Sequence, residues 1–190
     1  MKRSPAIAKL AMLALIAAAP FAASAADGID YNYLQGGYAA TNTASGDANG
    51  WGLQGSAALS QNFHLFGDFS HQDVKHSSAD FDQWRVGVGY NRQVSRNTDL
   101  LTRVAYEKFD AGSGLTASGY SVEAGARASL TPMLEGYALA GYEDGHDYDG
   151  DFYARLGAQV KFNRSWGLAA DVKLAKGGDH QYFVGPRLTW

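Results

Sequence analysis

Residues 51–60 read Trp-Gly-Leu-Gln-Gly-Ser-Ala-Ala-Leu-Ser, and along them apolar side chains alternate with small or polar ones. Successive side chains of a β-strand point to opposite faces, so a period of two predicts a strand with one apolar face. No stretch after residue 26 shows a sustained helical period of 3.6, and the sequence therefore predicts an all-β fold. The same alternation recurs at residues 84–90, 120–127, 152–161 and 166–174.

Alternation is also compatible with a soluble sandwich or a lipocalin-like barrel, but three features favour an antiparallel transmembrane β-barrel. The strands are about 10–11 residues long, which suits a tilted crossing of a bilayer. Aromatic residues such as Trp51, Trp84 and Trp166 lie where strands begin or end, as in the interfacial girdles of membrane barrels. The other face is rich in charge and glycine, which suits a wet or ion-paired lumen.

Short and long connections alternate along the chain. Short turns are typical of the periplasmic ends of outer-membrane strands, and longer loops are typical of the surface ends. Four turns and five loops predict ten strands; eight is the alternative, because residues 63–74 and 134–142 alternate less cleanly. The expected turns are residues 61–62, 94–97, 131–133 and 163–165, and the expected surface loops are residues 42–49, 75–80, 110–116, 143–150 and 176–179.

The first 25 residues have the organisation of a secretory signal peptide. Three basic residues within the first nine precede an apolar run over residues 10–23, and Ala-Ser-Ala follows at 23–25. The run is shorter than the roughly 20 residues that cross a bilayer as a helix. We therefore expect Sec-type export with cleavage near Ala25. The barrel is then residues 26–190, located in a bacterial outer membrane.

Composition narrows the possible functions. The chain has 190 residues, no cysteine and a formal net charge of -3, and loss of the three basic residues of the signal peptide leaves -6. Such a chain lacks the basic footprint of a nucleic-acid-binding protein. The absence of cysteine excludes a disulfide scaffold.

The last strand carries a pattern of its own. A terminal aromatic residue after alternating apolar positions is typical of the C-terminal strand that outer-membrane assembly machinery recognises by strand pairing. Phe183 departs from this pattern, and Pro186 has to face away from the ladder. We expect barrel assembly machinery and periplasmic chaperones as partners during biogenesis, and outer-membrane lipid and lipopolysaccharide around a monomer. The residues of this assembly signal are Tyr182, Val184, Gly185, Leu188 and Trp190.

The polar faces of the strands place charge inside the barrel. Five acids and seven bases are expected there, and buried charges need partners. We therefore expect a plugged or water-filled scaffold, with a narrow and weakly selective pore as the alternative. The twelve residues are Asp68, Arg85, Arg103, Glu107, Glu123, Arg127, Glu135, Arg155, Lys161, Asp171, Lys173 and Arg187.

The histidines give little support to an enzyme. The pairs His146-Asp147 and Asp179-His180 are adjacent in sequence, and neighbouring residues of an extended segment point in opposite directions. No nucleophile is fixed beside either pair. We expect no catalytic residues and no cofactor.

An acidic loop is a weak candidate for a metal site. Residues 143–151 hold five carboxylates, and hard cations such as Ca²⁺ prefer closely spaced carboxylate oxygens. The spacing and the distal glutamate of an EF-hand are absent, so we expect a solvated loop without a bound metal. The candidate ligands are Asp144, Asp147, Asp149 and Asp151.

Five segments resemble the small outer-membrane proteins of xanthomonads and their relatives, a family described as regulated by diffusible signals and as activating plant immune recognition. The resemblance implies an outer-membrane barrel whose expression follows quorum signals, and it supplies no catalytic residues. Three roles stay open: a structural or surface-interaction scaffold, which we favour, a narrow pore, and a quorum-regulated factor on the surface or in vesicles. The segments are residues 81–90 (Phe-Asp-Gln-Trp-Arg-Val-Gly-Val-Gly-Tyr), 103–114, 135–144, 155–163 and 183–187.

Overall fold

The computed structural model of the chain describes residues 25–44, 46–112, 114–146 and 148–190. The expected signal peptide, apart from Ala25, lies outside the described residues. No described segment forms a helix that is long and apolar enough to cross a membrane.

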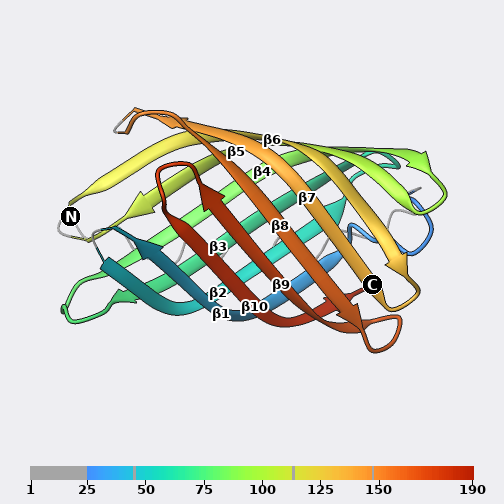
Figure 1. Cartoon of the computed structure of the whole chain (residues 1–190), viewed down its shortest axis with the longest axis horizontal. Coiled ribbons are helices and arrows are strands. Elements are labelled where there is room, and N and C mark those ends of the chain that lie inside the picture. The colour runs from blue at the N-terminus through green and yellow to red at the C-terminus, as the bar shows by residue number, and fades with distance from the viewer. Residues whose placement is uncertain (1–24, 45, 113, 147) are drawn as a thin grey trace.

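Ten antiparallel strands form a closed barrel (Figure 1). Each strand pairs with its neighbour in sequence, and β10 pairs with β1, so no strand edge is left open. The prediction of ten strands is confirmed, and the alternative of eight is wrong. The strands are β1 (Tyr33–Thr43), β2 (Gly46–Ala58), β3 (Phe63–Val74), β4 (Asp80–Ser95), β5 (Thr98–Asp110), β6 (Thr116–Thr131), β7 (Leu134–Gly145), β8 (Asp151–Lys161), β9 (Trp166–Ala175) and β10 (His180–Thr189).

The connections divide the barrel into two ends. The turn end, on the right in Figure 1, holds the connections at residues 59–62, 96–97, 132–133 and 162–165. The loop end, on the left, holds those at residues 44–45, 75–79, 111–115, 146–150 and 176–179.

The expected loop at residues 42–49 is wrong, because β1 and β2 continue through most of it. Thr43 pairs with Gly46, and its hydroxyl donates to the Gly46 carbonyl oxygen at 2.9 Å. Ala48 stays buried on the inner face. The inward–outward alternation therefore persists to the last residues of this hairpin. Two strands are also longer than expected, since β4 and β6 have 16 residues each.

The outer surface is apolar, because alternate residues of every strand point away from the lumen. A protein that crosses hydrocarbon must pair every backbone group internally and present apolar side chains to lipid. The closed ladder and this belt meet both conditions. Among the exposed side chains are Val86, Val88, Leu100, Val104, Val122, Leu130, Leu156, Val160, Leu168 and Val184.

Aromatic side chains gather toward both ends of this belt. Trp84 and Tyr106 lie toward the loop end with ring centroids 5.6 Å apart, and Phe63 and Tyr90 lie toward the turn end at 5.1 Å. Trp166, near the β8–β9 turn, is half exposed. This arrangement is that of two interfacial girdles.

Glycines allow the barrel to close between β1 and β10. A Cβ on Gly37 would lie 2.1 Å from the Val184 carbonyl oxygen, and a Cβ on Gly185 would lie 2.1 Å from that of Gly36. A side chain at either position would push the two backbones apart. The β1–β10 register is interrupted beside these glycines. Pro186, which has no amide hydrogen to donate, lies in that gap with its ring exposed outside.

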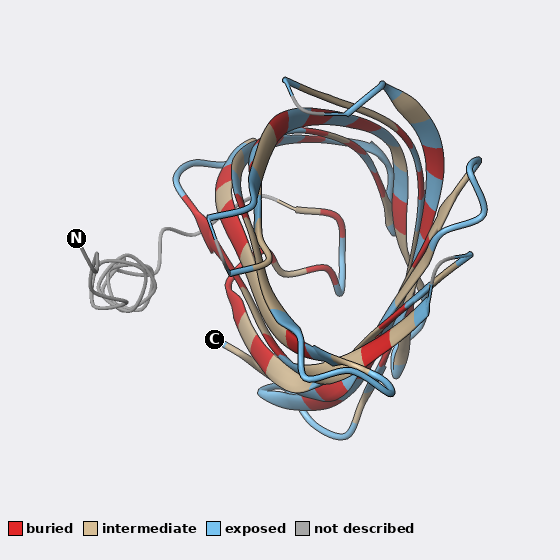
Figure 2. Cartoon of the chain, turned by 90° about the vertical axis from the view of Figure 1, so that its left-hand side faces the viewer, coloured by how far each residue is buried: buried red, intermediate tan, exposed pale blue. Residues whose placement is uncertain are grey.

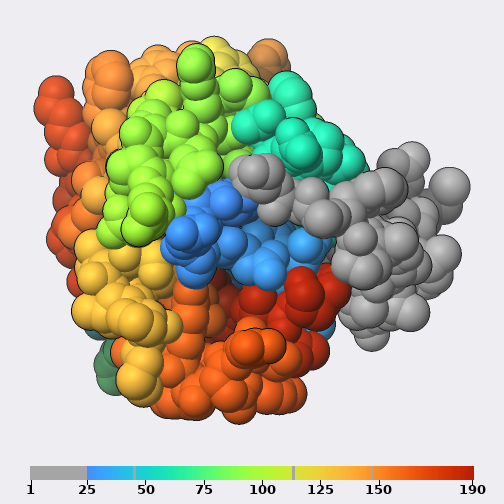
Figure 3. All heavy atoms as spheres, turned by 90° about the vertical axis from the view of Figure 1, so that its right-hand side faces the viewer, coloured from blue at the N-terminus to red at the C-terminus, as the bar shows by residue number. Residues whose placement is uncertain are grey.

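Residues 26–32, here called the plug segment, precede β1 and join no strand. They cross the interior of the ring of strands (Figure 2) and occupy the middle of the turn end (Figure 3, blue). Ala26, Ile29 and Tyr31 are buried there against Leu101 and Leu139 of the barrel wall. The main apolar cluster of the interior therefore lies at the turn end.

The apolar belt leads to a first prediction. Val104 is 57% exposed near the middle of β5, and Leu130 is 60% exposed beside the β6–β7 turn. In lipid, Val104→Arg should lower the free energy of unfolding by about 2–4 kcal/mol, whereas Leu130→Arg, near the interface, should cost about 1 kcal/mol or less. Urea titration of vesicle-inserted protein, followed by tryptophan fluorescence, measures both. Equal and small effects would show that this belt does not face hydrocarbon.

Candidate functional site in the barrel lumen

The lumen is lined by charge from eight of the ten strands. The twelve charged residues predicted to point inward lie on the inner wall, where the period of two places them. The structure divides them into three sets. A central cluster holds Asp68, Arg85, Arg103, Glu107, Glu123, Arg155 and Asp171; a turn-end cluster holds Arg127, Glu135 and Lys161; Lys173 and Arg187 have separate partners.

Glu123 is the centre of the central cluster. It is fully buried on β6. Its Oε2 lies 3.0 Å from Arg85 Nη2 on β4, and its Oε1 lies 3.0 Å from Arg155 Nε on β8. Arg103 Nη1 lies 3.9 Å from Oε2, and the Tyr153 hydroxyl donates to Oε1 at 3.0 Å. One carboxylate thus joins side chains from four other positions across the lumen.

Arg85 and Arg155 connect Glu123 to further carboxylates on other strands. Arg85 Nε lies 2.9 Å from Glu107 Oε1, and Arg85 Nη1 lies 3.7 Å from Asp68 Oδ2. Arg155 Nη1 lies 3.4 Å from Asp171 Oδ1 on the other side. The guanidinium fork suits such bridging, because it presents several donors in one plane. The network therefore spans β3 to β9 through the middle of the barrel.

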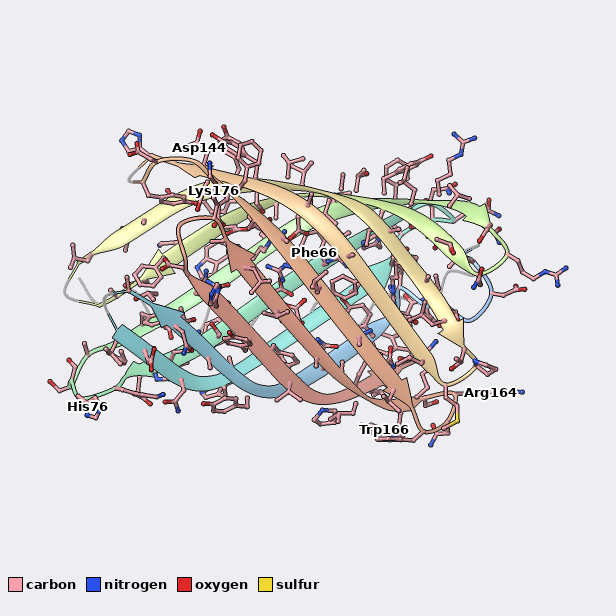
Figure 4. All side chains as sticks on the ribbon, viewed as in Figure 1. Phe66, His76, Asp144, Arg164, Trp166 and Lys176 are labelled. Atoms are coloured by element: carbon pink, nitrogen blue, oxygen red, sulfur yellow. The ribbon has the colours of Figure 1, made fainter. Side chains whose placement is uncertain are left out.

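Phe66 supports the cluster from the turn-end side. Its ring lies inside the barrel (Figure 4) and is 2% exposed. The guanidinium carbons of Arg85 and Arg103 each lie 5.1 Å from its centroid. A cation over an aromatic face is stabilised electrostatically, more so away from water. This contact supplements the long Arg103–Glu123 pair.

The turn-end cluster fastens the plug segment. Arg127 Nε donates to Glu135 Oε1 at 2.6 Å, and Lys161 Nζ lies 3.0 Å from Glu135 Oε2. Both bases also reach the plug: Arg127 Nη2 donates to the Asp30 carbonyl oxygen at 2.8 Å, and Lys161 Nζ donates to that of Gly28. The same side chains therefore pair with one another and hold the plug.

Further polar contacts fix both ends of the plug segment. Asp27 N donates to the carbonyl oxygen of Arg96 at 2.8 Å in the β4–β5 turn. Asn32 Oδ1 accepts from Ala58 N at 2.9 Å, and its carbonyl oxygen accepts from Trp190 N at 3.3 Å. The segment is thus tied to three separate connections or strand ends. It lies across the turn end of the lumen.

The remaining lumen bases pair locally. Lys173 donates to Glu143 and lies 4.4 Å from the ring centroid of Tyr153. Arg187 donates to Gln35 and, at 3.0 Å, to Gln159 Oε1. Each of the seven lumen bases therefore meets a carboxylate or an amide oxygen.

A small cavity of about 70 Å³, lined by both polar and apolar side chains, lies between the central cluster and the loop end. Gln72, Gln83 and Gln181 line it together with charges of the cluster. It has room for a few water molecules and is far smaller than the roughly 300–1,000 Å³ of ordinary ligand pockets.

The C-terminal strand presents its predicted residues as follows. Tyr182 and Val184 are exposed on the outer face, and Leu188 is half-buried there. Trp190 follows the last strand at the turn end and is 37% exposed. Phe183, which departs from the alternating pattern, is buried on the inner wall and pairs with the small Ala39 of β1. Its side chain borders a cavity on the loop side of the lumen.

The acidic loop does not gather its carboxylates. Asp144 accepts from Gly145 N and from the Tyr120 hydroxyl, and Asp151 accepts from Gly177 N. Asp147 lies outside the described residues. Within the described part of the chain, no group of three or more His, Asp or Glu residues is placed to hold a metal ion.

Three features of the site were not found from the sequence. The plug segment shows no regular alternation of apolar and polar residues in the sequence. Its partner Asp99 lies at the start of a strand. Glu143 was assigned to a loop, although β7 extends to Gly145 and its carboxylate faces Lys173. The addition of Asp99 and Glu143 makes the lumen acids equal in number to the seven bases.

A histidine–carboxylate pair was also missed. His71 Nδ1 lies 2.7 Å from Asp82 Oδ1, and His71 Nε2 lies 4.0 Å from Asp80 Oδ2. These residues face outward at the loop end of β3 and β4, which are paired directly at His71 and Asp82. The direct cross-strand register, which sequence spacing alone does not reveal, brings them together.

The fold and this interior define the class as a small outer-membrane-type β-barrel whose inner wall carries paired charges. Similar solved structures include a KdgM porin, with 11% identity over 83% of this chain and 99% of the porin and a TM-score of 0.46. They also include Ail, the attachment invasion locus protein of Yersinia pestis, with 13% identity, coverage of 85% and 100%, and a TM-score of 0.41.

An enzyme is also among the similar folds. The outer membrane phospholipase OMPLA of Salmonella typhi has 13% identity over 84% of this chain and 90% of its own, with a TM-score of 0.38. No protein-family model matches the chain, and no curated protein matches it. These likenesses concern the fold alone.

The central cluster leads to a second prediction. Glu123→Gln removes the acceptor shared by three arginines and leaves their charge buried. Loss of one partner of a buried ion pair costs about 3–5 kcal/mol. Asp47→Asn is the control, because the side chains of Asp47 and Lys75 are 42% and 47% exposed. Loss of this exposed ion pair should lower the free energy of unfolding by less than about 1 kcal/mol. Urea unfolding in detergent micelles measures both, and equal effects would mean that Glu123 is not the centre of the network.

Proposed function

We propose that this protein is a closed structural barrel of the bacterial outer membrane, which supports the envelope and displays short surface loops without conducting solutes. The observation that carries the proposal is the double obstruction of the lumen. The central cluster bridges the walls at mid-height, and the plug segment closes the turn end.

The two obstructions act in series. A solute that passed the plug would still have to separate Glu123 from Arg85 and Arg155. Such a step exposes buried charge without its partner, which is costly in a low-dielectric interior. The cavity on the loop side therefore does not continue past the central cluster.

The proposed orientation places the turn end in the periplasm and the loop end outside the cell. Short periplasmic turns and longer outer loops are the rule for such barrels. In this orientation the outer belt meets lipid, and the loop-end carboxylates face lipopolysaccharide.

The proposed partners in biogenesis are periplasmic chaperones and the barrel assembly machinery. We propose no enzymatic activity.

A narrow pore is the second candidate function. The glutamines Gln72, Gln83 and Gln181 give the loop-side cavity a polar lining, as a permeation path requires. In that case water would have to pass between the members of the central cluster. The two candidates differ in conductance.

Planar-bilayer recording separates them. The purified protein should give no unit conductance steps across a range of salt concentrations. A refolded chain that begins at Tyr33 lacks the plug and should stay closed, because the central cluster is intact. The same chain with Arg85→Ala and Glu123→Ala should conduct.

Each protein must first migrate differently before and after boiling, which shows that the barrel is folded. Unit steps from the unmodified protein, abolished by Arg103→Ala, would support the pore and contradict the closed scaffold.

The C-terminal strand gives a prediction about assembly. If assembly machinery reads the terminal aromatic residue, Trp190→Ala should reduce by severalfold the amount of folded protein in the outer membrane. Trp166→Ala is the matched control, because Trp166 is also an exposed tryptophan at the turn end. The heat-modifiable band of isolated membranes measures the yield. Equal losses would assign Trp190 to the interfacial girdle only.

A further inference from the structure

Asp99, at the start of β5, is a fully buried carboxylate at the turn end. Its Oδ1 accepts from Ala26 N at 3.1 Å, and its Oδ2 accepts from the Tyr31 hydroxyl at 3.1 Å. Both donors belong to the plug segment and both are neutral. Arg127 lies opposite Asp99 in the β5–β6 register but pairs with Glu135 instead. Among the described residues, no lysine or arginine lies within 4.0 Å of the Asp99 carboxylate.

This arrangement is unlike that of the other lumen acids. Glu107, Glu123, Glu135 and Asp171 each meet at least one base. A buried charge is costly unless it is paired, and a carboxylate held by two neutral donors gains further from a cation at hydrogen-bond distance. Asp99 is therefore a site that fits a cation at the position of Ala26 N.

Cleavage of the Ala25–Ala26 bond would create that cation. Hydrolysis adds water across the peptide bond: the carboxylate stays on Ala25, and the nitrogen of Ala26 leaves as an amine that takes up a proton. We propose that Asp99, with Tyr31, is the receptor site for the α-ammonium group of the processed chain, so that removal of the leader locks the plug segment in the barrel.

The local backbone already aims the nitrogen at Asp99. The Ala26 carbonyl oxygen accepts from Ile29 N at 3.0 Å, and Asp27 N is held by Arg96 at 2.8 Å. Ala26 itself is 2% exposed. These contacts do not involve the Ala25 side of the nitrogen. The position of the nitrogen is therefore set by the plug and the wall.

The proposal goes beyond the closed scaffold, because the same ion pair could form in a barrel that conducts. It also gives processing a structural consequence. Before cleavage, Ala26 offers Asp99 one neutral N–H; after cleavage, it offers a full charge. The plug is then held more tightly in the processed chain.

The test compares refolded chains that begin at Ala26 with a free or an acetylated amine. The free amine should raise the midpoint of thermal unfolding by about 5 °C, read from the unboiled gel band. This difference should vanish in Asp99→Asn. It should persist in Asp30→Asn, the matched control, because the Asp30 side chain accepts from Asn32 N, whereas Ala26 N donates to Asp99.

A second measurement keeps the proposal testable if Asp99→Asn folds poorly. Only the neutral amine reacts with an acylating reagent, and an ion pair that raises its pKa by about one unit lowers the neutral fraction about tenfold. Acylation of the Ala26 amine is followed by mass spectrometry as a function of pH, and the rate at neutral pH is divided by the limiting rate at high pH in the same state, which removes the effect of burial. This ratio should be about tenfold lower in the folded wild-type chain than in urea.

Three results would overturn the proposal. Free and acetylated chains could unfold at the same temperature, or the ratio of the neutral-pH rate to the high-pH rate of acylation could be the same in the folded and urea-unfolded chains. The protein isolated from outer membranes could also begin at a residue other than Ala26. None of these results bears on conductance, so they do not decide the proposed scaffold function.

Discussion

The interior depends on the ion pairs between Glu123 and the three arginines around it. A strand that spans a membrane must face lipid on one side, so its polar residues all point to the other. Ten such strands bring more charge into the lumen than water in a 70 Å³ cavity can solvate. Pairing across the lumen is the remaining solution, and Glu123 with Arg85 and Arg155 provides it. The ion pairs of the interior are thus a consequence of the apolar exterior.

Much of the barrel follows from sequence for the same reason. The alternation over residues 51–60 and the spacing of the turns predict ten strands, because lipid on one face requires a strict period of two. The prediction fails at residues 42–49, where the strands extend beyond the apolar belt. There Asn42 and Asp47 pair although neither has an apolar face to mark it. Outside the membrane, hydrogen bonding continues without a hydrophobic pattern.

The contacts between the lumen charges are harder to predict from sequence than the strands. The period of two assigns Arg155 to the inner wall, but it does not say that Arg155 on β8 reaches Glu123 on β6. That contact depends on side-chain length and on the stagger of the strands. The plug segment is harder still to predict from sequence, because its residues adopt no repeating conformation. Its hydrogen bonds to Asp99 and Arg127 depend on the whole barrel being in place.

The position of the plug segment has a consequence for the order of folding. Its partners lie far along the chain: Asp99 is 73 residues from Ala26, Arg127 is 97 residues from Asp30, and Lys161 is 133 residues from Gly28. Contacts of such long sequence separation form late, because the intervening chain must first be organised. The pairing of β1 with β10 spans a still longer separation, 152 residues between Gln35 and Arg187. The segment synthesised first among these therefore docks late, together with the closure of the barrel.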